Sequence, residues 1–176
     1  MPILRKLLRD TRAAAAVEFA ILAPVMLALY LGGAQLAQGF SVYRLVSLTS
    51  STVTNLVTQY STISASQTMP DILNASVQVL YPNDSDNAKI VVSSISIDSK
   101  GKATVAWSQT LNGTVRPTGQ VVTVPTALNI PGSTIILGET TYAFTPAFDF
   151  LKLGALTLSS SIYMVPRAAT TINLTS

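Results

Sequence analysis

The chain has 176 residues, of which 48% are apolar and only 11% are charged, a low share beside the roughly 25% of typical soluble domains. It contains no cysteine and no histidine, so disulfides and thiolate sites are excluded, and an enzyme would need other general acids and bases. The net charge of +3 does not indicate a nucleic-acid partner, because the Lys and Arg residues after residue 43 are scattered singly, without stacking aromatic residues.

A basic cluster precedes a long apolar run at the N-terminus. The run, residues 13–34, is apolar except for Glu18, and its 22 residues extend about 33 Å as a helix, close to the roughly 30 Å hydrocarbon thickness of a bilayer. Basic segments next to a membrane span tend to stay on the cytoplasmic side. We therefore predict a cytoplasmic leader in residues 1–12, a membrane-spanning helix in residues 13–34, and a periplasmic remainder beyond the inner membrane. The cluster consists of Arg5, Lys6, Arg9 and Arg12, opposed only by Asp10.

Two features of this run bear on its structure and processing. Pro24 removes one backbone hydrogen bond and predicts a kink or a local loosening of the helix, although membrane helices tolerate proline. The small residues Gly32, Gly33 and Ala34 fit a signal peptidase, so a cleaved signal and a secreted binding domain beginning near Gln35 is an alternative. The run is longer than a usual signal core, and Glu18 interrupts its start.

Beyond Gln35 the apolar pattern stays helical to about Tyr60. Apolar residues recur mostly at steps of three and four, with Ser, Thr, Gln and Asn opposite, which predicts a stalk roughly 35 to 40 Å long. If this stalk helix breaks, residues 47–51 are the place that the sequence favours, because they are rich in hydroxyl side chains. A loop follows, and Asp71 after Pro70 opens a short second helix. The apolar stripe of the predicted stalk helix consists of Leu36, Phe40, Tyr43, Val46, Val53, Val57 and Tyr60.

After the turn-rich segment PNDSDN, residues 82–87, the apolar period changes from that of a helix to that of strands. Residues 89–98 and 103–111 predict a hairpin with Ile95, Ile97, Val105 and Trp107 on its buried face.

Two further segments complete the predicted sheet. Residues 115–124 predict a loop with a short strand, and residues 134–145 and 155–165 predict a second strand pair. The predicted fold is α+β: a long N-terminal helix, a helical stalk and short second helix in residues 35–81, and a small, mostly antiparallel four-stranded sheet domain in residues 82–176. The amphipathic helix and the one-sided sheet bury each other's apolar faces.

The sequence predicts no catalytic, cofactor or metal site. Asp84 and Asp86 place oxygen ligands as in half of a calcium loop, but Ala88 and Ile95 stand near the places of the glycine and final glutamate that such a loop needs. An Asx turn is the simpler interpretation. The serines have no neighbouring candidate base, and no phosphate-binding loop is complete, so we do not expect an enzyme.

The stretch RAAAAVEFAILAPVMLALYLGG, which begins at Arg12, resembles the N-terminal signature of the TadE/TadG-like family, pilin-like proteins of the Tad (tight adherence, Flp-type) pilus machinery. In that family a basic segment is followed by a small residue, four residues, Glu, an aromatic residue and an apolar helix with Pro. Ala13, Glu18, Phe19 and Pro24 stand at these places. The C-terminal stretches TYAFTPAFDF and LSSSIYMVPR are also similar to the family, and the resemblance implies a pilin-like shape.

The resemblance further implies processing and assembly. A prepilin peptidase would cut between Ala13, which stands where the family more usually has glycine, and Ala14. The new amine at Ala14 would be positive, and Glu18 of a neighbouring subunit would neutralise it and fix the helix register. Phe19 would serve peptidase or helix recognition, and Pro24 local helix melting.

The implied function is that of a minor pilin or pseudopilin. Its implied partners are other pilins, the pilus assembly machinery, a prepilin peptidase and membrane lipid. A permanently anchored periplasmic adaptor or binding protein is the alternative from another class.

Overall fold

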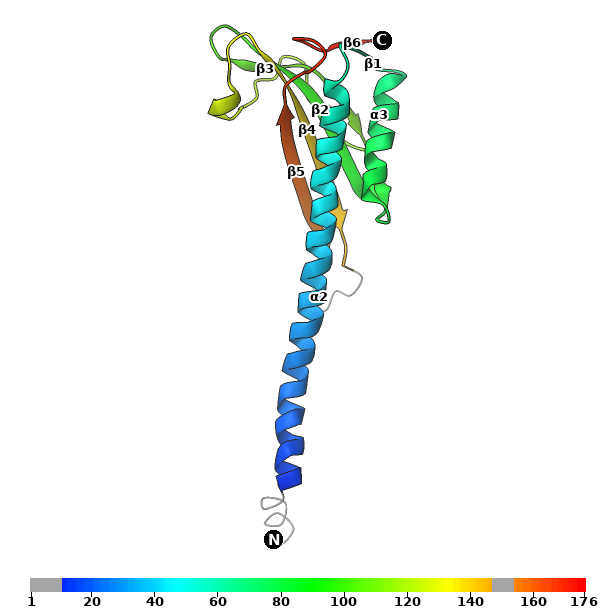
Figure 1. Cartoon of the computed structure of the whole chain (residues 1–176), viewed down its shortest axis with the longest axis vertical. Helices are drawn as coiled ribbons and strands as arrows, with labels where there is room; N and C mark the ends of the chain where they lie inside the picture. Colours follow the sequence, from blue (N-terminus) through cyan, green and yellow to red (C-terminus); the bar gives the residue numbers. More distant parts are fainter. Residues whose placement is uncertain (1–10, 147–153) are drawn as a thin grey trace.

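A computed structural model describes residues 11–146 and 154–176 of the chain (Figure 1). It confirms the predicted α+β fold: a long apolar N-terminal helix, α2 (Thr11–Thr58), packs on a four-stranded antiparallel sheet at its outer half. The other elements are β1 (Thr62–Ser64), α3 (Thr68–Val77), η1 (Gln78–Leu80), η2 (Ser85–Asn87), β2 (Ala88–Ile97), β3 (Ala103–Leu111), η3 (Thr126–Leu128), β4 (Thr134–Phe144), β5 (Leu156–Met164) and β6 (Asn173–Thr175).

Helix α2 is continuous over 48 residues, which corresponds to about 72 Å of helical rise. It passes through residues 47–51 without the break that their composition allows, and it ends two residues before Tyr60. The backbone N–H groups of Gln59 and Tyr60 donate to carbonyls three residues back, each at 3.2 Å, so the chain tightens and leaves the helix there.

The buried stripe of α2 differs from the predicted one. Val46, Val53 and Val57 are fully buried as predicted, but Leu36 and Phe40 remain exposed because burial against the sheet domain begins only at Val42. Tyr43 and Tyr60, which lie beyond Val42, are exposed as well. Hydroxyl side chains, which were expected on the opposite face, fill the rest of the buried stripe. These are Thr49, Ser50, Thr54 and Thr58.

The buried hydroxyls are accommodated because each donates to a backbone carbonyl. Thr49 donates to Leu45 at 2.9 Å and Thr54 to Ser50 at 2.6 Å, both within the helix. Ser50 donates across the interface to the carbonyl of Ser160 in β5, at 3.1 Å. Small polar side chains therefore let the helix backbone lie close to the sheet without leaving unpaired donors.

The sheet has the order β3-β2-β4-β5, and all of its pairs are antiparallel, which confirms both predicted strand pairs. Strict alternation would place Val105 and Trp107 on one face of the sheet, but the register between β2 and β3 shifts between Ser94 and Ile95. Val105 pairs with Ile95, whereas Trp107 pairs with Ser94 and packs in the core on the α2 side. The single buried face predicted for this hairpin is therefore wrong.

A two-stranded parallel sheet lies beyond the predicted elements. β1 pairs with β6, so the C-terminal segment lies beside residues 62–64, which were predicted as part of a loop. Strands of three residues carry too little pattern to be recognised in a sequence. The short helix α3 also begins at Thr68, earlier than predicted, because Pro70 falls in its first turn, where no N–H partner is required.

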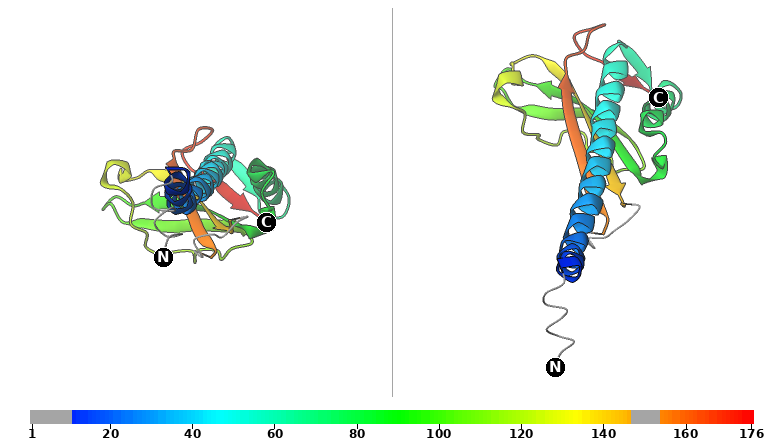
Figure 2. Two further views of the ribbon diagram at one scale, coloured as in Figure 1. Left: turned by 90° about the horizontal axis from the view of Figure 1, so that it is seen from below. Right: turned by 60° about the horizontal axis from the view of Figure 1, so that its bottom comes forward.

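Apolar cores form on both faces of the sheet. The larger core lies between the sheet, α2 and α3, and Figure 2 shows both helices along the sheet from two further directions. The smaller core contains Ile95, Ile97, Ile135 and Leu137, against which Val122 of the segment between β3 and β4 packs. That segment is a loop as predicted, but its expected short strand is reduced to one bridge between Thr104 and Val121.

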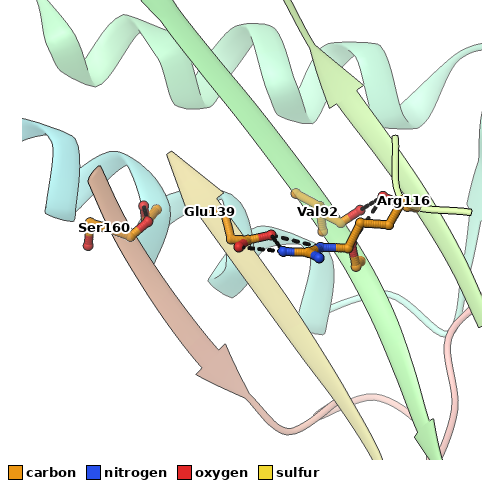
Figure 3. Close-up of polar contacts among 7 residues, drawn as sticks. Val92, Arg116, Glu139 and Ser160 are labelled. Atoms are coloured by element: carbon orange, nitrogen blue, oxygen red, sulfur yellow. Dashed lines mark hydrogen bonds and ion pairs between the residues drawn. The ribbon is translucent and has the colours of Figure 1, made fainter. Parts of the chain in front are cut away.

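An ion pair holds this loop to the sheet on the face away from α2. The Arg116 guanidinium donates to both carboxylate oxygens of Glu139 in β4, with its Nη2 2.7 Å from Oε1 and its Nε 3.0 Å from Oε2 (Figure 3). Glu139 follows Gly138, whose α-carbon faces α2, so the carboxylate points to the opposite face. The pair was not predicted, because 23 residues separate its members.

Replacing Arg116 with methionine is expected to lower the free energy of unfolding by only about 0.5–1 kcal/mol, because both side chains are about 30% exposed and water screens the pair. The larger change should be local. Amide hydrogen exchange should rise in residues 115–122 while β2 keeps its protection. Equal protection of the loop in the variant and the parent chain would show that the smaller core and the backbone hydrogen bonds of Gly119, Gln120 and Val122 to β3 hold it without the ion pair.

Candidate membrane and assembly site

The inner half of α2 is covered by no other described element. Its large apolar side chains are all exposed from Val17 through Tyr30, and Phe19 is 72% exposed. The helix reaches a mean hydropathy of 2.1 in its most apolar window, none of which is buried. It is therefore long and apolar enough to cross a membrane.

Glu18 is exposed on this apolar half-helix. No hydrogen bond or ion pair joins it to another side chain that the structure describes. Ala14 lies four residues before it on the same helix face, at about 6 Å of helical rise. The structure thus places the residue that would become the N-terminus and the acid on one side of one helix.

Phe19 follows Glu18 and projects about 100° around the helix from it, so the two side chains lie on different faces of α2. Pro24 lies within the continuous helix, where its missing N–H deprives the carbonyl of Ala20 of its usual partner. Ala13 lies in the first turn, and its side chain is outside the described part. The basic residues Arg5, Lys6 and Arg9 and the acid Asp10 also lie outside the described residues.

Small residues make one side of the inner half-helix shallow. Pro24, Ala28 and Gly32 recur at steps of four, and they line an open apolar groove along the helix. Membrane helices use such surfaces for close contact with other helices. Pro24 was predicted to kink the helix and Gly32 to belong to a signal-peptidase site, but the face that both share with Ala28 was not predicted.

The described residues hold no group of three or more acids that could bind a metal ion. Asp84 accepts a hydrogen bond from the backbone N–H of Asp86 at 3.0 Å, and the Asn87 amide donates to its other oxygen at 3.3 Å. This is the Asx-type turn that was preferred over a calcium loop, and here it caps η2.

The fold and the exposed half-helix define a class of protein. Its members have an apolar helix that can span a membrane and that continues into the core of a small α+β domain. The family model of TadE-like protein matches residues 13–54, which confirms the resemblance predicted from the N-terminal sequence. The matched segment contains Glu18, Phe19 and Pro24 and ends at Thr54, within the buried half of α2. It indicates a component associated with the Tad pilus machinery. No curated protein and no solved structure matches the chain.

Proposed function

We propose that this chain is a minor pilin or pseudopilin that acts as a structural component in the biogenesis of a Tad pilus. The observation that carries the proposal is the division of α2 into two halves. The outer half, from Val42, shares a core with the sheet, whereas the inner half exposes its apolar side chains on all sides. Such a surface is stable in lipid or in a bundle of other apolar helices, and not in water.

The proposed topology follows from charge. Residues 1–12 carry four basic residues and one acid, which favours the cytoplasm, and residues 13–34 then cross the inner membrane. The stalk and second helix of residues 35–81 and the sheet domain of residues 82–176 stand in the periplasm, and incorporation into a pilus carries them outside the cell. The sheet domain contacts neighbouring pilins, while α2 supplies the helix contact.

Glu18 has its role in this proposal after a prepilin peptidase cuts between Ala13 and Ala14. The cut creates a positive amine on the face of α2 that also carries Glu18. When helices pack together, both groups lose water, and the carboxylate offsets the cost of burying the amine. Pairing between neighbouring subunits fixes their axial register, whereas pairing within one helix only neutralises the charge.

Mass spectrometry of the mature protein, isolated from cell membranes, tests this proposal. We expect a chain that begins at Ala14. A chain that begins at Met1 would instead support a permanently anchored adaptor or binding protein, and one that begins near Gln35 a secreted domain.

A matched pair of variants identifies the protease. Ala13→Gly restores the family's more usual residue and should be cut at least as completely as the parent chain. Ala13→Leu should remain uncut, because its side chain is too large for the small position before the cut. Equal cleavage of the two variants would contradict processing by a prepilin peptidase.

A further inference from the structure

An apolar groove of about 340 Å³ lies where α2 meets the inner ends of β4 and β5. Its helix wall contains Leu36, Phe40 and Tyr43, and its sheet wall contains Phe144, Leu156 and Leu158. Figure 1 shows these strand ends beside α2, at the boundary between its free inner half and its packed outer half. We call this feature the boundary groove.

The inner end of the boundary groove lies at the depth of lipid headgroups. Residues 14–34 extend about 31 Å and account for the hydrocarbon thickness of a bilayer. The headgroup region adds about 5–8 Å on each side, so Gln35 and Leu36, about 1.5 and 3 Å beyond Ala34, lie within it. Phe40, about 9 Å beyond Ala34, lies at its outer edge, where aromatic side chains are typical.

Gln35 provides a second, independent observation. Its side-chain Oε1 and Nε2 are both shielded from solvent, and neither has a hydrogen-bond partner among the described residues. Gln35 also lines the boundary groove, whose other lining side chains are almost entirely apolar. A buried amide without a partner costs about 1–3 kcal/mol, so a polar group in the groove would stabilise Gln35 once its side chain turned toward that group.

We propose that the boundary groove holds a phospholipid of the leaflet that faces the sheet domain. An acyl chain lies between α2 and the ends of β4 and β5, and the Gln35 side chain turns toward the headgroup, where an ester or phosphate oxygen accepts a hydrogen bond from its Nε2. The inner end of the sheet thereby rests on the membrane surface. This inference rests on the proposed membrane insertion of residues 13–34, with which the groove is continuous along α2.

Lipid fits this groove better than a second protein for two reasons. The groove begins directly beyond the residues that would lie in hydrocarbon, so an acyl chain enters it without leaving the bilayer. Its described lining also contains no charged side chain that would select a peptide partner.

The chain contains no natural cysteine, so a single introduced cysteine carries a nitroxide label at one known position. The main variant is Leu156→Cys, since Leu156 is 39% exposed and belongs to the sheet wall of the groove. The matched control on the same strand is Ser161→Cys, an exposed position about 17 Å further along β5. Leu27→Cys reports insertion of the helix itself.

The full chain is placed in vesicles of phosphatidylethanolamine and phosphatidylglycerol, and collisions of each label with oxygen and with a water-soluble nickel chelate are measured. Oxygen concentrates in hydrocarbon and the chelate stays in water. We expect the ratio of oxygen to chelate collisions to be highest at Leu27, and several-fold higher at Leu156 than at Ser161.

Equal ratios at Leu156 and Ser161, with a high ratio at Leu27, would overturn the lipid site and leave membrane insertion intact. A low ratio at Leu27 would contradict membrane insertion, and the lipid site with it. Dipolar broadening between Leu156 labels of neighbouring molecules would assign the groove to a second copy of the chain, which also overturns the lipid site.

Discussion

Replacing Gly138 with alanine is expected to lower the free energy of unfolding by about 1–3 kcal/mol, because α2 crosses β4 at this residue with no room for a side chain. A Cβ atom at Gly138 would collide with Oγ1 of Thr54 and lie 3.1 Å from the backbone carbonyl oxygen of Ser50. A rotamer change can move the Thr54 hydroxyl, whereas the Ser50 carbonyl moves only with the helix. The substitution therefore separates α2 from the sheet.

Denaturation in detergent, followed by the fluorescence of the buried Trp107, measures this effect. Gly33→Ala is a matched control, since a Cβ atom there would meet nothing within 4 Å. It should leave the domain as stable as the parent chain.

The double variant Gly138→Ala with Thr54→Ala tests the cause. Removing the Thr54 hydroxyl relieves the closest collision, so the double variant should lose less stability than the sum of the two single losses. Additive losses would show that the Ser50 carbonyl, rather than Thr54, sets the distance between helix and sheet.

The fold was predictable where one periodicity extends over many residues. The ends of β4 and β5 lie within one residue of the predicted strands, because their alternation continues to both ends. The apolar run of α2 is equally unambiguous, since 22 residues with a single acid fit only a few structures in water or lipid.

Prediction failed where tertiary contacts decide the outcome. Thr49, Ser50 and Thr54 are polar by composition, yet they are buried because the sheet approaches α2 closely at Gly138. The hydrogen bonds of Thr49 and Thr54 to carbonyls four residues back, and that of Ser50 to the carbonyl of Ser160 in β5, leave no trace in the apolar pattern. The glycine in the middle of a predicted strand was the available signal, because such a glycine often marks a close backbone approach.

The candidate site divides in the same way. The spacing from Ala13 through Glu18 and Phe19 to Pro24 is local, so the sequence alone identified the segment that the TadE-like family model matches. The boundary groove joins Gln35 to Leu156, which are 121 residues apart, and only the folded chain brings them together. Its one local signal is the exposed aromatic pair Phe40 and Tyr43, which helical periodicity alone places in the apolar stripe.

Replacing Glu18 with glutamine is expected to abolish recovery of the chain in pilus-associated complexes while leaving the folded domain unchanged. Glu18 is exposed and lies about 36 Å along α2 from Val42, where the core begins, so the denaturation midpoint of the domain should not move. Within a helix bundle, however, glutamine leaves the Ala14 amine buried without a counter-charge. That loss corresponds to about 3–5 kcal/mol, or more than about a hundredfold in association.

The measurement is the ratio of chain in sheared pilus fractions to chain in the inner membrane, with the mature N-terminus checked in each variant. Val17→Ala is the matched control: its side chain is 59% exposed beside Glu18, and its replacement removes apolar area but no charge. It should assemble nearly as well as the parent chain, because two methyl groups contribute far less than an unpaired buried amine. A Glu18→Gln chain that is cut after Ala13 and recovered in pili at the parent level would show that the amine finds another partner, and that Glu18 does not set the register of the helices.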